Sequence, residues 1–125
     1  MDLVTHGLIL FGHGARDARW KDPFERLEAL LRSAHPGPVS LAFLELMEPD
    51  LPAAIGDQVA HGCERITVIP VFFGQGGHVR RDLPEIIEQC RETYPDIEIR
   101  YSGAVGEDEG VLASIVTFCL AQAAQ

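Results

Sequence analysis

ITVIPVFFGQGGHVRRDLPE (residues 66–85) joins an apolar run to a glycine-rich turn that carries a histidine and two arginines. The apolar run is nearly continuous, which is typical of a β-strand covered on both faces. The acidic and proline residues at the far end, DLPE (82–85), predict the start of a helix. The same order recurs in LILFGHGARD (8–17), where His13 stands between two glycines and Arg16 follows. Strand, turn and helix in this order predict parallel α/β units.

Further apolar runs extend this pattern along the chain and predict strands over residues 3–11, 39–46, 65–73 and 97–103. Between and after the strands, apolar residues recur with the 3.6-residue period of a helix. These helical positions are Phe24, Leu27, Leu30, Leu31 and Ala34; Leu51, Ala54, Ile55 and Val59; Leu83, Ile86, Ile87 and Cys90; and Val111, Ile115, Phe118 and Cys119. The order β-α-β-α-β-α-β-α predicts a single domain over residues 1–125. Its expected fold is a four-stranded, mainly parallel sheet flanked by helices on both faces, a flavodoxin-like half domain.

Proline and acidic residues predict where the helices begin and end. DPFE (22–25) and DLPE (82–85) each predict an acidic N-cap followed by an early proline. Glu48 precedes the helix over 51–59 and is interpreted mainly as its cap. HPGP (35–38) and YPD (94–96) predict the ends of two helices.

The charge of the chain excludes some classes of partner. Acidic residues number 19 against 10 basic ones, which gives a formal net charge of −9, whereas surfaces that bind nucleic acid are net basic. Arginines nonetheless gather beside the two glycine-flanked histidines, at Arg16, Arg19, Arg80 and Arg81. Because a guanidinium group pairs well with carboxylate or phosphate, we expect an anionic small molecule as the ligand.

The chain shows no signal for a membrane or for secretion. No run reaches the about 18 apolar residues of a membrane helix, and the N-terminal segment lacks a basic leader and a cleavage site. We therefore expect a cytoplasmic protein that does not bind membranes. Cys63, Cys90 and Cys119 are widely spaced and form no CxxC pair, so they predict buried thiols rather than a disulfide or a zinc site.

Three potential ligand residues are spaced about one βα unit apart along the chain. His13, Glu45 and His78 are separated by 32 and 33 residues, and parallel sheets bind ligands beyond the carboxyl ends of their strands. We therefore expect the three side chains at one edge of the sheet. Two imidazoles and a carboxylate can hold a first-row divalent metal, or they can accept protons near neutral pH. Glu48 is the alternative carboxylate.

Other interpretations of these segments stay open. The glycines at 74–77 could instead cradle a phosphate at the start of a helix. They lack the third glycine of a dinucleotide fingerprint and the Lys-Ser/Thr of a P-loop. The remaining histidines have no comparable context and are interpreted as structural or solvated: His6, His35 and His61.

LILFGHGARD (8–17), FLELMEPDLPAAI (43–55) and VIPVFFGQGGHVRRDLPEI (68–86) together resemble the short form of the class II chelatases, the CbiX-type sirohydrochlorin chelatases. The resemblance covers roughly residues 7–120. It implies a lyase that inserts a divalent metal into the anionic tetrapyrrole sirohydrochlorin during cobalamin- or sirohaem-type biosynthesis. Co²⁺ is the first expectation, and Ni²⁺ and Fe²⁺ are the alternatives. It implies no ATP and no cofactor beyond the substrate metal. Longer relatives place two such domains across one cleft, so the resemblance implies a homodimer for this chain.

The resemblance also implies roles for single residues. The family's metal-binding histidines match His13 and His78, and its glutamate matches Glu45 by spacing, so these three are expected to bind the metal and to act in catalysis. Residues expected to contact the tetrapyrrole are Arg16, Glu48, Phe73, Gly74, Gln75, Gly76, Gly77 and Arg80. The physiological metal, the pathway and the dimer face are left open.

Two other functions fit parts of the pattern. A non-catalytic carrier of metal or tetrapyrrole would use the same pocket, and it would form metallated product only in proportion to the protein added. A histidine-phosphatase-like enzyme carries an Arg-His-Gly motif, whereas Gly12 precedes His13 here. That difference counts against phosphoryl transfer.

Overall fold

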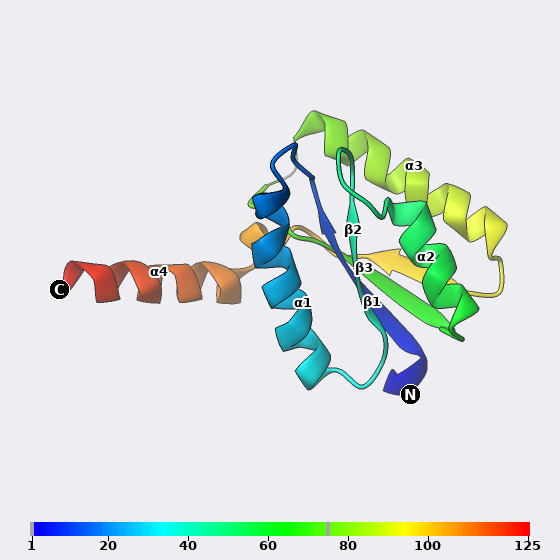
Figure 1. Cartoon of the computed structure of the whole chain (residues 1–125), viewed down its shortest axis with the longest axis horizontal. Helices are drawn as coiled ribbons and strands as arrows, with labels where there is room; N and C mark the ends of the chain where they lie inside the picture. Colours follow the sequence, from blue (N-terminus) through cyan, green and yellow to red (C-terminus); the bar gives the residue numbers. More distant parts are fainter. Residues whose placement is uncertain (1, 75) are drawn as a thin grey trace.

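The computed structural model describes residues 2–74 and 76–125, and the side chain of His78 also lies outside the description. Within the described residues, one sheet contains β1 (His6–Gly12), β2 (Val39–Phe43), β3 (Arg65–Pro70) and β4 (Glu98–Tyr101). Their order across the sheet is β2-β1-β3-β4, and each neighbouring pair is parallel. The predicted α/β fold is confirmed, and the carboxyl ends of these strands share one edge (Figure 1).

Helices cover both faces of the sheet, as predicted. α1 (Asp22–Ala34) packs on one face, whereas α2 (Leu51–Ala60) and α3 (Gly77–Thr93) pack on the other (Figure 1). The last helix, α4 (Glu109–Ala123), runs away from the sheet and contains no buried residue. The described residues also form three short 3-10 helices: η1 (Leu3–Thr5) before β1, η2 (Ala18–Lys21) before α1 and η3 (Val105–Glu107) before α4.

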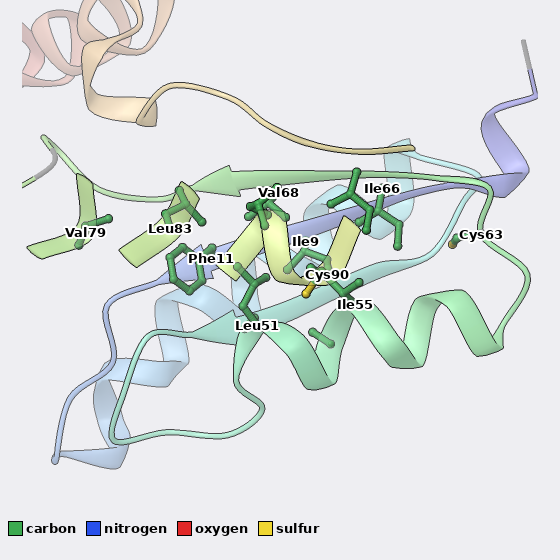
Figure 2. Close-up of a cluster of buried hydrophobic side chains, with 14 residues drawn as sticks. Ile9, Phe11, Leu51, Ile55, Cys63, Ile66, Val68, Val79, Leu83 and Cys90 are labelled. Atoms are coloured by element: carbon green, nitrogen blue, oxygen red, sulfur yellow. The ribbon is translucent and has the colours of Figure 1, made fainter. Parts of the chain in front are cut away.

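The larger core cluster lies between the sheet and the helices α2 and α3 (Figure 2). Alternate strand residues point into it, because successive side chains of a strand face opposite sides of the sheet. Ile9, Phe11, Ile66 and Val68 are all 0% exposed there, and full burial of such side chains stabilises a fold by about 1.5–3 kcal/mol each. A smaller cluster around Leu10, Leu41 and Phe43 lies under α1. These cores fix the strand ends from which the functional loops emerge.

The strands are shorter than the apolar runs predict. Residues 3–5 form η1, β2 ends at Phe43 rather than at residue 46, and β3 ends at Pro70 rather than at residue 73. The physical reason is that a strand continues only while its neighbour offers backbone partners. The β1–β2 ladder ends at the Gly12–Phe43 pair and the β1–β3 ladder at the Phe11–Pro70 pair. Glu45 therefore lies in a loop and not on the strand.

The start of α3 differs from the prediction. The helix begins at Gly77, five residues before the predicted cap at Asp82, and Pro84 lies inside it. An interior proline removes one helical hydrogen bond, but the longer helix buries Val79 to 4% exposed and continues the apolar stripe of Leu83. α1 likewise begins at Asp22 itself and has no side-chain cap. Burial of Val79, rather than capping, thus favours the early start of α3.

The cysteines are not all buried. Cys63 and Cys90 are buried as predicted, and burial raises the pKa of both thiols. Cys119 is exposed, so the prediction was wrong there, because its helix α4 does not pack on the sheet. Among the described residues, no helix has the length and apolar character needed to cross a membrane.

Candidate functional site

The turns that follow β1 and β2 are hydrogen-bonded to each other beyond the ends of the strands. The backbone N–H of Leu44 donates to the carbonyl of Gly12 at 2.9 Å, and the N–H of Glu45 donates to the carbonyl of His13 at 3.2 Å. The backbone pairing of β1 and β2 thus continues for two residues after regular strand geometry stops. It is this extension that makes His13 and Glu45 neighbours.

The side chains of His13 and Glu45 form a pair at the strand-end edge. Nε2 of His13 lies 3.1 Å from Oε1 of Glu45, and the two side chains are 52% and 51% exposed. The ring of His13 also packs edge-on against Phe72, with 6.3 Å between ring centroids. A half-exposed pair of this kind contributes at most about 1 kcal/mol to stability. The pair is therefore placed to meet a ligand rather than to hold the fold.

Gly14 allows the two turns to approach this closely. Its φ of +95° lies in the left-handed region, which side chains other than glycine rarely adopt. A Cβ on Gly14 would lie 1.8 Å from the backbone oxygen of Glu45. Glycine is thus required here both by its own backbone conformation and by the neighbouring loop.

An apolar pocket of about 400 Å³ opens beside His13. Besides His13, Gly14 and Ala15, its lining residues are Trp20, Phe24, Phe43, Met47, Val71 and Phe72. Trp20 is 64% exposed, although large aromatic side chains gain most from burial. Trp20 and Phe72 were not predicted from the sequence, although each is an aromatic residue close to a glycine-flanked histidine. The pocket can receive a flat apolar ring system.

The third predicted metal-binding residue cannot be compared with this pair. α3 places the backbone of His78 at its second residue, after β3 at the same edge of the sheet. The side chain of His78 and all of Gln75 lie outside the described residues. Among the described residues, no group of three or more His, Cys, Asp and Glu side chains could hold a metal ion. The complete His13–Glu45–His78 set stays a prediction.

Phe73 and the glycines after β3 form the second turn of the predicted site. Phe73 is 70% exposed, while its backbone is fixed by η3. The N–H of Gly106 donates to the carbonyl of Phe72 at 2.9 Å, and a Cβ on Gly106 would lie 2.3 Å from Phe73. At Gly74, Gly76 and Gly77, by contrast, a Cβ would meet no atom of the described residues within 4 Å, so packing against that part of the chain does not require these three glycines.

The arginines near the site differ in their surroundings. Arg16 lies in the loop after β1 and Arg80 in the first turns of α3, and both are exposed. Arg19 is engaged by a neighbour, since its Nη2 donates to Oδ2 of Asp17 at 2.7 Å and lowers the pKa of that carboxyl group. Arg16 and Arg80 are the arginines predicted to contact an anionic ligand, and both side chains are exposed to one.

Glu48 is not the cap of α2. The carboxylate of Asp50 accepts the N–H of Ala53 at 2.9 Å and fills that role. Glu48 lies two residues too early to reach the first turn, and its backbone carbonyl accepts a hydrogen bond from Lys21 at 3.3 Å. The carboxylate that contacts His13 is that of Glu45, so the geometry favours Glu45 over Glu48.

The other histidines have structural partners, as predicted. Nε2 of His6 lies 2.7 Å from the hydroxyl of Thr67, and Nε2 of His35 lies 2.7 Å from the carbonyl of His6. Burial is the main cause that lowers the pKa of His6. Nδ1 of His61 lies 2.7 Å from a backbone carbonyl in the last turn of α2. None of the three belongs to the strand-end edge that carries His13.

Comparison with known proteins finds relatives that are similar to most of this chain in sequence and fold. The CbiX family model matches residues 7–117. The sirohydrochlorin cobaltochelatase of Methanothermobacter thermautotrophicus is 33% identical over 81 residues, which cover 65% of this chain and 57% of that protein. A putative cobalamin biosynthesis CbiX protein from Marinobacter aquaeolei superposes with a TM-score of 0.83 and 30% identity, over 94% of this chain and 96% of that one.

About half of a longer chelatase chain has the same fold as this protein. The sirohydrochlorin chelatase SirB from Bacillus subtilis subspecies spizizenii, solved in complex with cobalt, matches with a TM-score of 0.77 and 27% identity. The match covers 90% of this chain but 48% of SirB. This chain therefore spans about half the length of SirB and less than two thirds of the Methanothermobacter protein.

Proposed function

The chain belongs to the CbiX family, and from this premise we propose that it is a sirohydrochlorin chelatase, an enzyme that inserts a divalent metal into sirohydrochlorin. Cobalt is the proposed metal, because the relative is named a cobaltochelatase and SirB was solved with cobalt. The single observation in this chain that carries the proposal is the His13–Glu45 pair, with 3.1 Å between its polar atoms, beside an apolar pocket.

The pair supplies what metal insertion needs from a protein. Insertion replaces two pyrrole N–H protons of the macrocycle by bonds to the metal, so two protons have to leave. In the tautomer of His13 that donates Nε2–H to Glu45, the other ring nitrogen, Nδ1, carries the lone pair that accepts a proton. The carboxylate of Glu45 then stabilises the imidazolium, and its half-exposed position allows release of the proton to water. The same two groups can bind the substrate metal ion before insertion.

The surroundings fit a broad, flat and anionic substrate. Trp20 and Phe72 line the pocket beside His13 and offer aromatic surface to the face of the macrocycle. Glycines at 74, 76 and 77, which packing against the described residues does not require, allow a ring to approach the backbone closely. Arg16 and Arg80 can pair with peripheral carboxylates. Phe73, exposed after β3, completes the proposed contact surface.

The direct test is anaerobic insertion followed by absorbance. Purified protein is incubated with sirohydrochlorin and Co²⁺, Ni²⁺ or Fe²⁺ in separate reactions, and the product is measured over many equivalents of substrate. Turnover well above the amount of protein supports a chelatase, with the fastest rate for Co²⁺. Product that stops at one equivalent per protein would identify a carrier instead.

Glu45→Gln is expected to lower the insertion rate by about 10- to 100-fold, because the neutral amide no longer stabilises a protonated His13 or binds the metal as an anion. Glu48→Gln is the matched control and should change the rate by less than about twofold, since surface substitutions away from a site have small effects. Steady-state kinetics of both variants decide between the two carboxylates. A larger loss in Glu48→Gln would show that the wrong glutamate was assigned.

Arg80→Ala is expected to raise KM for sirohydrochlorin by up to about fivefold with little change in kcat, since exposed ion pairs contribute about 1 kcal/mol or less. Added salt should raise the KM of the wild type in the same direction, because salt screens exposed charges. Arg26→Ala, on the exposed side of α1, is the control. If KM changes neither with added salt nor with the loss of Arg80, this arginine does not bind the substrate.

We propose further that the working unit is a homodimer whose strand-end edges face each other. In one chain the His13–Glu45 pair is half-exposed at the mouth of a pocket of about 400 Å³. The chain matches about half of SirB, and a second copy would supply a comparable length of protein. Two-fold dimers are also the commonest closed oligomers.

A further inference from the structure

The helix α4 is apolar on all sides and has almost no charge. Its sequence, EGVLASIVTFCLAQA (109–123), contains a single charged residue, Glu109, at the first position. Val116, Phe118 and Leu120 are 56%, 64% and 66% exposed. A helix that is apolar all round is ordinarily buried, yet none of the residues of α4 is. The chain therefore presents a large apolar surface that its own sheet leaves uncovered (Figure 1).

α4 leaves the body of the protein next to the proposed site. It follows η3, whose Gly106 is hydrogen-bonded to Phe72 of the pocket. The side chain of Asp108 caps the helix by accepting the N–H of Val111 at 3.1 Å. The beginning of α4 is thus fixed at the strand-end edge, and the rest of the helix extends away from the sheet.

α1 carries an uncovered apolar strip of its own, formed by Leu27 and Leu30, which are 39% and 63% exposed. The guanidinium of Arg32 donates to the carbonyl of Val39 at 3.0 Å, so this side of α1 faces the edge strand β2. At 100° per residue, Leu27 and Leu30 lie about 140° and 160° round the helix from Arg32. The strip therefore lies on the opposite side of α1, away from β2.

A membrane is a poor fit for α4. At 15 residues, the helix is about 22 Å long, shorter than the about 30 Å core of a bilayer. It contains no lysine or arginine, whereas helices that lie on membrane surfaces are rich in both. Its apolar surface matches the strip on α1 in chemistry, and one chain carries both.

We propose that α4 is an exchanged arm: in a two-fold dimer, α4 of each chain docks on the Leu27–Leu30 strip of the other chain. This inference rests on the homodimer proposed above and names the surfaces that form it. A two-fold axis makes the exchange reciprocal, so each substitution changes two contacts at once. The arm starts next to the pocket loop, because Gly106 before it is hydrogen-bonded to Phe72.

The proposal predicts that one charge on either surface breaks the dimer. Phe118→Asp and Leu30→Lys are each expected to raise the dimer dissociation constant at least about 30-fold, because each buries an unpaired charge at an apolar contact. Both residues are exposed in the single chain, so circular dichroism should show an unchanged fold. Sedimentation over a concentration series gives the mass. Gln89→Lys, at an exposed position of α3, is the control and should leave the dimer intact.

Mixing the two variants tests the exchange itself. A dimer of one Phe118→Asp chain and one Leu30→Lys chain has one unchanged Phe118–Leu30 contact and one contact in which opposite charges meet. We therefore expect an equimolar mixture to dimerise at a concentration at which neither variant does so alone. Two monomeric variants that fail to dimerise when mixed would overturn the exchange, and so would a wild type that sediments as one chain at every concentration.

The same samples separate this inference from the chelatase assignment. Cobalt insertion into sirohydrochlorin is measured alongside the mass. Wild-type protein that is dimeric through α4 but inserts no metal would leave the exchanged arm in place and defeat the proposed activity. Wild-type protein that inserts metal as a single chain would support the proposed activity and defeat the exchanged arm.

Discussion

His13→Ala is expected to lower the rate of cobalt insertion by about 100-fold or more, because it removes the group that we propose accepts a proton from the macrocycle. The free energy of unfolding should change by no more than about 0.5 kcal/mol, since the side chain is 52% exposed and takes no part in the core. Insertion kinetics and urea denaturation measure the two quantities. His78→Ala, the second histidine predicted from the sequence, should show the same loss of rate.

The control for His13→Ala is His61→Ala. His61 is 68% exposed at the end of α2 and lies outside the strand-end edge. Its replacement should leave the insertion rate within about twofold of the wild type. Full turnover by His13→Ala with saturating metal would remove His13 from the chemistry. A drop in both variants would instead indicate a general effect of removing surface histidines.

Gly14→Ala is expected to reduce both stability and activity. An alanine at φ +95° costs about 1–2 kcal/mol of backbone strain. The new Cβ would also lie 1.8 Å from the backbone oxygen of Glu45, so that oxygen would have to move away. We therefore expect unfolding free energy to fall by more than about 2 kcal/mol. Since Glu45 would move away from His13, the insertion rate should also fall, by about tenfold or more. Urea denaturation and steady-state kinetics measure these changes.

Gly62→Ala separates the effect of backbone strain from the effect of the contact with Glu45. Gly62 has a similar φ of +90°, but a Cβ there would meet no atom within 4 Å. This variant should lose only the about 1–2 kcal/mol of backbone strain and keep its activity. Equal losses of stability in the two variants, with Gly14→Ala still active, would show that the contact between the Gly14 and Glu45 loops does not hold the site together.

The local pattern of the sequence was enough to predict the fold and the position of His13. Continuous apolar runs such as ITVIPVFF, separated by helical periods, leave little alternative to a parallel sheet between helices. In such a sheet the carboxyl ends of the strands share one edge, so a histidine that follows a strand has to lie there. Glu45 was identified by its spacing of one βα unit. Both predictions depend only on chain order and period, which are local properties.

The boundaries and the pocket depended on contacts between distant residues. α3 begins at Gly77 and passes through Pro84 because burial of Val79 favours the longer helix, and no local capping signal reports that burial. Trp20 and Phe72 share a pocket because the ends of different segments meet beside His13. Sequence separation alone gives no measure of such packing.

The sequence by itself determined the order of strands and helices, the edge of the sheet at which His13 and Glu45 lie, and the apolar character of residues 109–123. Only the tertiary structure decided that this last helix stays off its own sheet. Helical period reports which side chains are apolar, but not which surface covers them. In α4 every side is apolar and none is buried, because a helix of uniform character has no face that selects the sheet. The surface that buries α4 depends on which apolar surfaces lie within its reach in three dimensions, and the helical period does not contain that information.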